Sequence, residues 1–99
     1  MKIPKTLKIG AHTFKILYPY QFKERSDVYG TCNVSLGEIR ISDTDGNDRK
    51  LTSTQIGQSL FHEILHAIND IYVGSKLDER DIEGFSQGLF QVLNDNKLI

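Results

Sequence analysis

Residues 62 to 66 read His62-Glu63-Ile64-Leu65-His66, an HExxH pattern with two imidazoles four positions apart. On an α-helix, positions i and i+4 lie one turn apart on the same face, so both rings can reach one ion. Zn²⁺ favours such nitrogen ligands, and the glutamate between them is placed to take a proton from a water that the metal activates. The pattern predicts one zinc ion per chain, with His62 and His66 as ligands and Glu63 as the catalytic base.

The apolar residues around this pattern show which side of the helix is buried. At 100° per residue they fill an arc of about 180°. The arc contains Ile56, Leu60, Phe61, Ile64, Leu65, Ala67, Ile68, Ile71 and Tyr72. His62 and His66 lie outside it, so the helix is expected to pack deeply on one side and present His-Glu-His on the other. An exposed surface helix whose histidines have no function would not require so broad an apolar face.

A catalytic zinc usually has three protein ligands and a water. The third histidine, His12, lies on a predicted strand, so the candidates are downstream acids: Asp70, Asp78, Glu79, Asp81 and Glu83. A tight turn over residues 74–77 predicts two antiparallel helices. At 1.5 Å per residue, His66 then lies about 12 Å from the turn, Glu83 about 9 Å and Glu79 about 3 Å. We therefore expect Glu83 as the third ligand. Glu79 is the alternative, and its other role would be to stabilise the positive end of the helix dipole.

The helix boundaries carry clear signals. Thr52 followed by Gln55 forms a capping box, and Gly74 suits a left-handed cap after a helix that ends near residue 72 or 73. Asp78 is placed to cap the next helix, which is expected to continue to about Asn94.

The first half of the chain reads as strands. Residues 6–9 and 13–17 alternate in polarity around a short loop, and residues 28–34 and 38–42 form a second predicted hairpin. Residues 20–27 are ambiguous between a helical turn and a loop. We predict an α+β fold over residues 1–99 as a single domain. A small twisted, mostly antiparallel sheet would pack on the HExxH helix and a C-terminal glutamate helix.

Composition limits the classes of protein. The chain has 99 residues, 38% of them hydrophobic, and a net charge of −1, without the basic run that would indicate nucleic-acid binding. Cys32 is the single cysteine, which fits a reducing cytoplasm and a small buried side chain. The first ten residues lack the apolar segment of a secretory signal, and no stretch is suited to span a membrane. We expect a cytoplasmic protein, a monomer, with no nucleic-acid or membrane partner.

Two segments resemble a known family. HEILHAIND, followed by a helix with the sequence ERDIEGFSQGLFQVLNDN, is similar to small phage- and mobile-element-type HExxH zinc metallopeptidases, which resemble minimal gluzincins. The resemblance covers about residues 51–96 and implies a zincin-like fold. Gluzincins take their third ligand from a glutamate on a following helix, often as ExxS, and Glu83-Gly84-Phe85-Ser86 matches that setting. The resemblance also implies hydrolysis of a peptide or protein substrate, by an endopeptidase rather than an exopeptidase. The strand at residues 38–42 would hold the substrate at the sheet edge.

Several roles stay open in the sequence. Asp70 and Gln87 are candidate hydrogen-bond partners for the metal ligands. Side chains with suitable chemistry for stabilising an oxyanion are Tyr29, Tyr72, His12 and Arg40. The rival hypothesis is a non-catalytic, zinc-containing binding or regulatory module of a phage or mobile element, although a structural zinc site has no use for a base at Glu63.

Overall fold

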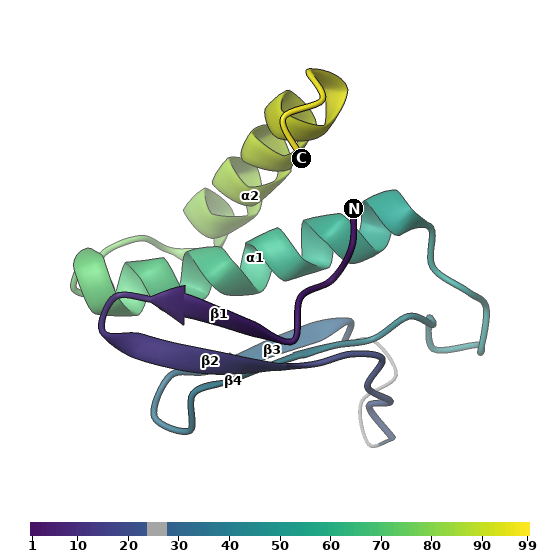
Figure 1. Ribbon diagram of the computed structural model, residues 1–99, viewed down its shortest axis with the longest axis horizontal. Helices are drawn as coiled ribbons and strands as arrows, with labels where there is room; N and C mark the ends of the chain where they lie inside the picture. The colour runs from purple at the N-terminus through teal and green to yellow at the C-terminus, as the bar shows by residue number, and fades with distance from the viewer. Residues whose placement is uncertain (24–27) are drawn as a thin grey trace.

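The computed structural model describes residues 1–23 and 28–99 and has an α+β fold, with one sheet beneath two helices (Figure 1). The strands are β1 (Thr6–Ile9), β2 (His12–Leu17), β3 (Gly30–Asn33) and β4 (Glu38–Ile41). The helices are α1 (Ser53–Tyr72) and α2 (Glu79–Asp95). Both predicted hairpins form. Of the segment predicted as ambiguous, residues 20–23 contain no helical turn, and residues 24–27 lie outside the described part of the chain.

The four strands form a mixed sheet in the order β1-β2-β4-β3. The pairs β1–β2 and β3–β4 are antiparallel, as expected for hairpins, but the central pair β2–β4 is parallel. This order corrects one prediction: β4 lies between β2 and β3, so residues 38–42 offer no free edge to a substrate. The two edge strands are β1 and β3, and β3 is the one that lies against the HExxH motif of α1, because its Gly30 approaches the Glu63 side chain.

The core lies between the sheet and α1, which crosses one face of it (Figure 1). Alternation along β2 and β4 turns Phe14 and Ile16, and Ile39 and Ile41, to this face, where all four are buried. On α1 they meet a cluster that includes Leu60. Most of the apolar arc predicted for the HExxH helix therefore anchors it on the sheet, whereas Phe61 packs against Phe90 of α2 and Tyr72 is exposed.

Both helices begin as predicted. Thr52 and Gln55 form a reciprocal capping box, and Asp78 forms another with Asp81. Gly74 adopts a left-handed conformation with φ of 66°, just beyond the end of α1. No helix in the described residues has both the length and the apolar character needed to cross a membrane.

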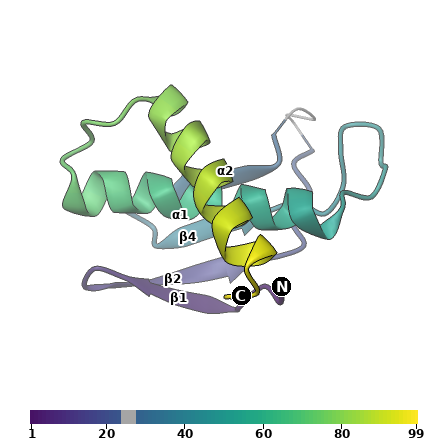
Figure 2. The same ribbon diagram turned by 90° about the horizontal axis from the view of Figure 1, so that it is seen from above.

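The packing of α2 on α1 differs from the prediction of antiparallel neighbours. Figure 2 shows α2 running obliquely across α1 rather than alongside it. The crossing is close because Gly57 has no side chain: a Cβ there would lie 2.4 Å from the Phe90 ring, which also packs edge-on against Phe61. Because the helices cross, only a few residues of α2 are buried against α1, and these include Ile82 and Ser86. The prediction that Glu83 lies level with His66 assumed antiparallel helices, and it therefore does not apply.

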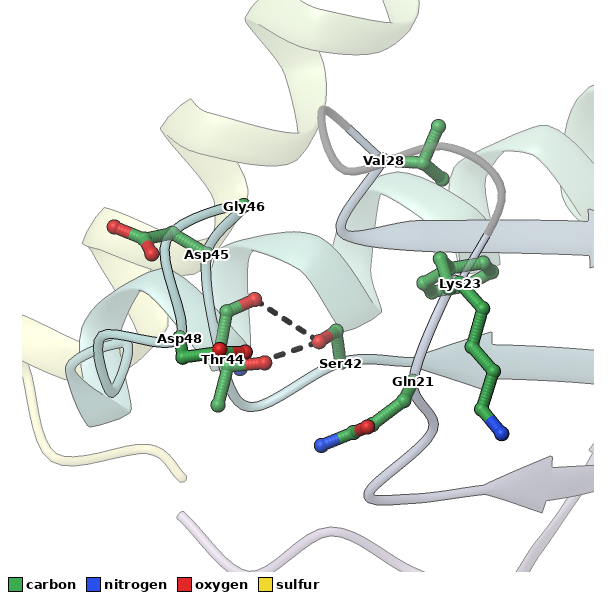
Figure 3. A pocket seen from close by; sticks show the side chains of 9 residues that line it. Gln21, Lys23, Val28, Ser42, Thr44, Asp45, Gly46 and Asp48 are labelled. Atoms are coloured by element: carbon green, nitrogen blue, oxygen red, sulfur yellow. Dashed lines mark hydrogen bonds between the residues drawn. The ribbon is translucent and has the colours of Figure 1, made fainter.

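The polar loop of residues 43–50 lies before α1 and borders a cavity (Figure 3). Ser42 directly precedes the loop, and its hydroxyl donates to the Thr44 carbonyl and accepts from the Thr44 amide. The Asp45 carboxylate points away from Ser42 and accepts from the Asn47 and Arg49 amides. These hydrogen bonds close the loop upon itself.

Candidate metal centre

The connection between the helices determines where α2 begins. Asn69, on α1, is buried, and its side-chain amide donates to the Leu77 carbonyl and accepts from the Leu77 amide, both at 3.1 Å. The Ser75 amide donates to the Asn69 carbonyl at 2.9 Å. Because Leu77 is so held, and Asp78 caps α2 directly after it, the first turn of α2 is fixed relative to the helix that carries the histidines.

This first turn brings Glu79 to the two histidines. Its carboxylate spans both rings, with Oε1 at 2.7 Å from His62 Nε2 and Oε2 at 3.1 Å from His66 Nε2. The two Nε2 atoms are 3.1 Å apart. His62, His66 and Glu79 thus form a group whose potential ligand atoms all lie within 4.8 Å of one another. Glu79 remains 66% exposed, so the centre is open to solvent on the side of α2.

Glu83 lies one turn further along α2 and contacts a different atom. Its Oε2 lies 3.0 Å from His62 Nδ1, and its Oε1 accepts from the Gln87 side-chain amide. An ionised carboxylate only accepts, so a neutral His62 ring that donates from Nδ1 to Glu83 carries its lone pair on Nε2, the atom that faces Glu79 and His66. Sequence register favoured Glu83 as a ligand, but the geometry favours Glu79 at the metal and Glu83 as the partner that orients His62.

The group has the size that a metal site requires. In a tetrahedral zinc site with bonds of about 2.0–2.1 Å, neighbouring ligand atoms lie about 3.3 Å apart. The two Nε2 atoms are 3.1 Å apart, and the Glu79 oxygens lie 2.7 and 3.1 Å from them, so the three groups need to separate by only a few tenths of an ångström to admit the ion. In the neutral tautomer that donates from Nδ1, the Nε2 lone pair and a Glu79 oxygen face each other, and a cation bound between them would satisfy both. The donor set therefore fits Zn²⁺.

Glu63 lies beside this group rather than within it. It is 7% exposed and packs against β3 where Gly30 leaves room: a Cβ on Gly30 would lie 3.0 Å from Glu63 Oε2. Burial raises the pKa of Glu63 to about 7; a protonated His62 opposes this rise, and the Glu79 carboxylate adds to it. A buried carboxyl with a pKa near neutrality is suited to accept and return a proton at physiological pH.

The remaining candidates separate into those near the centre and those remote from it. Asp70, predicted as a partner of His66, instead accepts from the Ser75 hydroxyl at 2.8 Å. Tyr29 lines the cleft next to Glu63. Arg40 lies on the opposite face of the sheet, over the Tyr20 ring. His12 packs against Phe14 in β2.

Tyr72, at the end of α1, lies near Gly10 in the β1–β2 turn, and it is 66% exposed. Of the four residues considered for oxyanion stabilisation, only Tyr29 is thus brought to the cleft. Cys32 is half-buried in β3, and burial raises the pKa of its thiol to about 12, with Glu63 and Asp70 adding to the rise. It is a protonated thiol at neutral pH.

Two contributors to the site were not identified from sequence. Gly30 carries no signal beyond its place at the start of a strand, because its role depends on the approach of Glu63 from α1. Gln58 lies one turn before His62, and helical spacing could have identified it, since position i−4 shares the face of the metal-binding ring.

No protein-family model, curated protein or solved structure matches this chain.

Proposed function

We propose that this protein is a zinc-dependent peptide hydrolase of the zincin-like type, with His62, His66 and Glu79 as metal ligands and Glu63 as general base. The observation that carries the proposal is the approach of Glu79 to both Nε2 atoms, at 2.7 and 3.1 Å, beside a buried glutamate. A structural zinc site has no need of such a glutamate. The resemblance of the sequence to small HExxH metallopeptidases supports the roles of His62, Glu63 and His66, whereas the ExxS setting favoured Glu83 rather than Glu79 as the third ligand.

A bound zinc ion would supply Lewis acidity to the scissile carbonyl and to the attacking water. Glu63 accepts the proton of the attacking water and returns it to the leaving amine. Glu83 holds the His62 ring by its Nδ1, and Gln87 holds Glu83 in turn. These contacts fix the tautomer and the orientation of the ring.

The substrate would lie in an extended conformation along β3. This strand is at the edge of the sheet, and its first residue borders the cleft that contains Glu63. An edge strand offers unpaired backbone groups, to which a peptide adds as a further strand. The cleft lies between this strand and α2, so a bound peptide passes directly beside Glu63.

Glu63→Gln tests the proposal, because it keeps the shape of the side chain and removes the base. We expect a normal zinc content and a loss of at least about 10²-fold in the hydrolysis of unstructured peptides, the scale for a general base. The assay uses a diverse peptide library with zinc-loaded protein. A wild type no more active than the variant would instead support a non-catalytic zinc-containing binding module.

A further inference from the structure

The cleft beside Glu63 is a cavity of about 510 Å³ whose walls come from the start of β3, the first half of α1 and the middle of α2. Its walls are polar to an unusual degree for a site that binds small molecules or side chains, since such sites are mostly apolar. They include three glutamines and two serines, namely Gln55, Gln58, Ser59, Ser86 and Gln87. Among residues 1–23 and 28–99, no lysine or arginine lines the cleft.

Most of these polar groups already have partners within the protein. Gln55 accepts from the Thr52 amide in the capping box, and the Ser59 hydroxyl donates to the Gln55 carbonyl. The Ser86 hydroxyl donates to the Glu83 carbonyl, and the Gln87 amide donates to the Glu83 carboxylate. These four residues build the walls of the cleft and hold its shape.

Gln58 differs from them. It is half-buried in the wall of the cleft, yet within residues 1–23 and 28–99 its side chain makes no hydrogen bond. It lies one turn before His62 on α1, so its carboxamide is on the same face as the metal-binding ring. A carboxamide offers two donors and an acceptor, and a ligand that covers such a group without hydrogen bonding to it binds less tightly.

We infer that Gln58 selects the substrate residue next to the scissile bond, and that the cleft takes peptides with an uncharged hydrogen-bonding side chain, such as that of Gln or Asn, at this position. This inference rests on the proposed function. An apolar side chain would cover the Gln58 carboxamide without forming a hydrogen bond to it. An acidic side chain would approach the Glu63 and Glu83 carboxylates, which also line the cleft.

The test compares zinc-loaded wild type with Gln58→Met, which keeps the length of the side chain but removes both hydrogen-bonding groups. The substrates are matched peptides that differ only next to the scissile bond, which is first located by sequencing the products from a mixed library. For the wild type we expect kcat/KM to be about tenfold or more higher for the peptide with Gln than for the peptide with Leu. A site built to hydrogen-bond a side chain rejects an analogue that cannot form the bond. In Gln58→Met the preference should disappear or reverse.

Gln91→Met is the matched control, because Gln91 is exposed on α2, where it donates to Asp95, and it does not line the cleft. Its preference should equal that of the wild type. Gln58→Glu is a second variant that should gain a preference for Lys, which a merely structural role would not produce. Calorimetric Kd values of the same peptides for Glu63→Gln and for the Glu63→Gln/Gln58→Met double variant provide a readout independent of turnover.

The outcomes separate the two proposals. A wild type that cleaves peptides with the same preferences as both Gln58 variants overturns the role of Gln58 and leaves the proposed function standing. A wild type that prefers Leu or Glu at this position also overturns it. A zinc-loaded wild type that neither cleaves nor binds any peptide overturns both.

Discussion

The connection between the helices, residues 73–78, and the loop of residues 43–50 are both turns held by side-chain contacts to the backbone, but they differ in where the contacts come from. In the loop, Asp45 binds the Asn47 and Arg49 amides, so the segment closes upon itself. In the connection, Leu77 is held by buried Asn69 from within α1. The first arrangement fixes only a local shape. The second fixes one helix on another and thereby places a carboxylate opposite two histidines.

The largest effect should come from the carboxylate that the connection delivers. Glu79→Ala should lower zinc affinity by more than about 100-fold. Glu83→Ala should lower it by only about tenfold, at the lower end of the range for losing a partner that orients a ligand. The measurement is a competition titration of each variant against a chelator of known affinity. Equal losses, or a greater loss for Glu83→Ala, would restore the assignment expected from sequence register.

The next largest effect is expected at Asn69, whose side chain holds Leu77 in the connection between the helices. Asn69→Ala removes both hydrogen bonds to Leu77 and should lower the free energy of unfolding by about 1–3 kcal/mol, because two backbone groups lose their partner. It should also lower zinc affinity by about tenfold, the usual scale when a residue that orients a metal ligand is lost. Denaturation of the metal-free protein and chelator competition measure the two effects. If stability falls and zinc affinity does not, then the connection does not position Glu79.

The helix crossing gives a smaller effect, on stability. Gly57→Ala would place a Cβ 2.4 Å from the Phe90 ring. We expect a loss of about 1–3 kcal/mol in the free energy of unfolding, as for other overpacked sites. Gly88→Ala is the control, since nothing lies within 4 Å of its Cβ position. It should stabilise α2 by up to about 1 kcal/mol through helix propensity. Similar losses in both variants, measured by urea denaturation, would argue against a close crossing at Gly57.

The smallest effect is expected in the loop. Asp45→Ala should leave zinc affinity unchanged and lower the melting temperature less than Asn69→Ala. The hydrogen bonds from the Arg49 and Asn47 amides lower the pKa of Asp45 below its ordinary value of 3.8. A lowered pKa means that the carboxylate stabilises the fold above pH 3.8 and loses this contribution as the pH falls through the folded-state value. The melting-temperature difference from wild type, measured by calorimetry, should therefore shrink in acid. A difference independent of pH would contradict the role of the ionised carboxylate.

The sequence by itself determined the features that depend on short spacings. The capping boxes at Thr52 and Asp78 and the left-handed Gly74 follow from interactions between residues at most a few positions apart. The face shared by His62 and His66 follows from helical periodicity. Both hairpins were predicted for the same reason, since alternation and turn residues are local signals.

Only the tertiary structure decided which glutamate meets the histidines, which strand forms the edge beside them and which residues line the cleft. The parallel pairing of β2 with β4 joins two hairpins that carry no local signal for their order. The oblique path of α2 depends on the contact between Gly57 and Phe90, which are far apart in the chain. Glu79 and Glu83 lie one turn apart on the same helix, so spacing alone does not distinguish them. The crossing of the two helices does, because it brings Glu79 to both Nε2 atoms and Glu83 to the other side of the His62 ring.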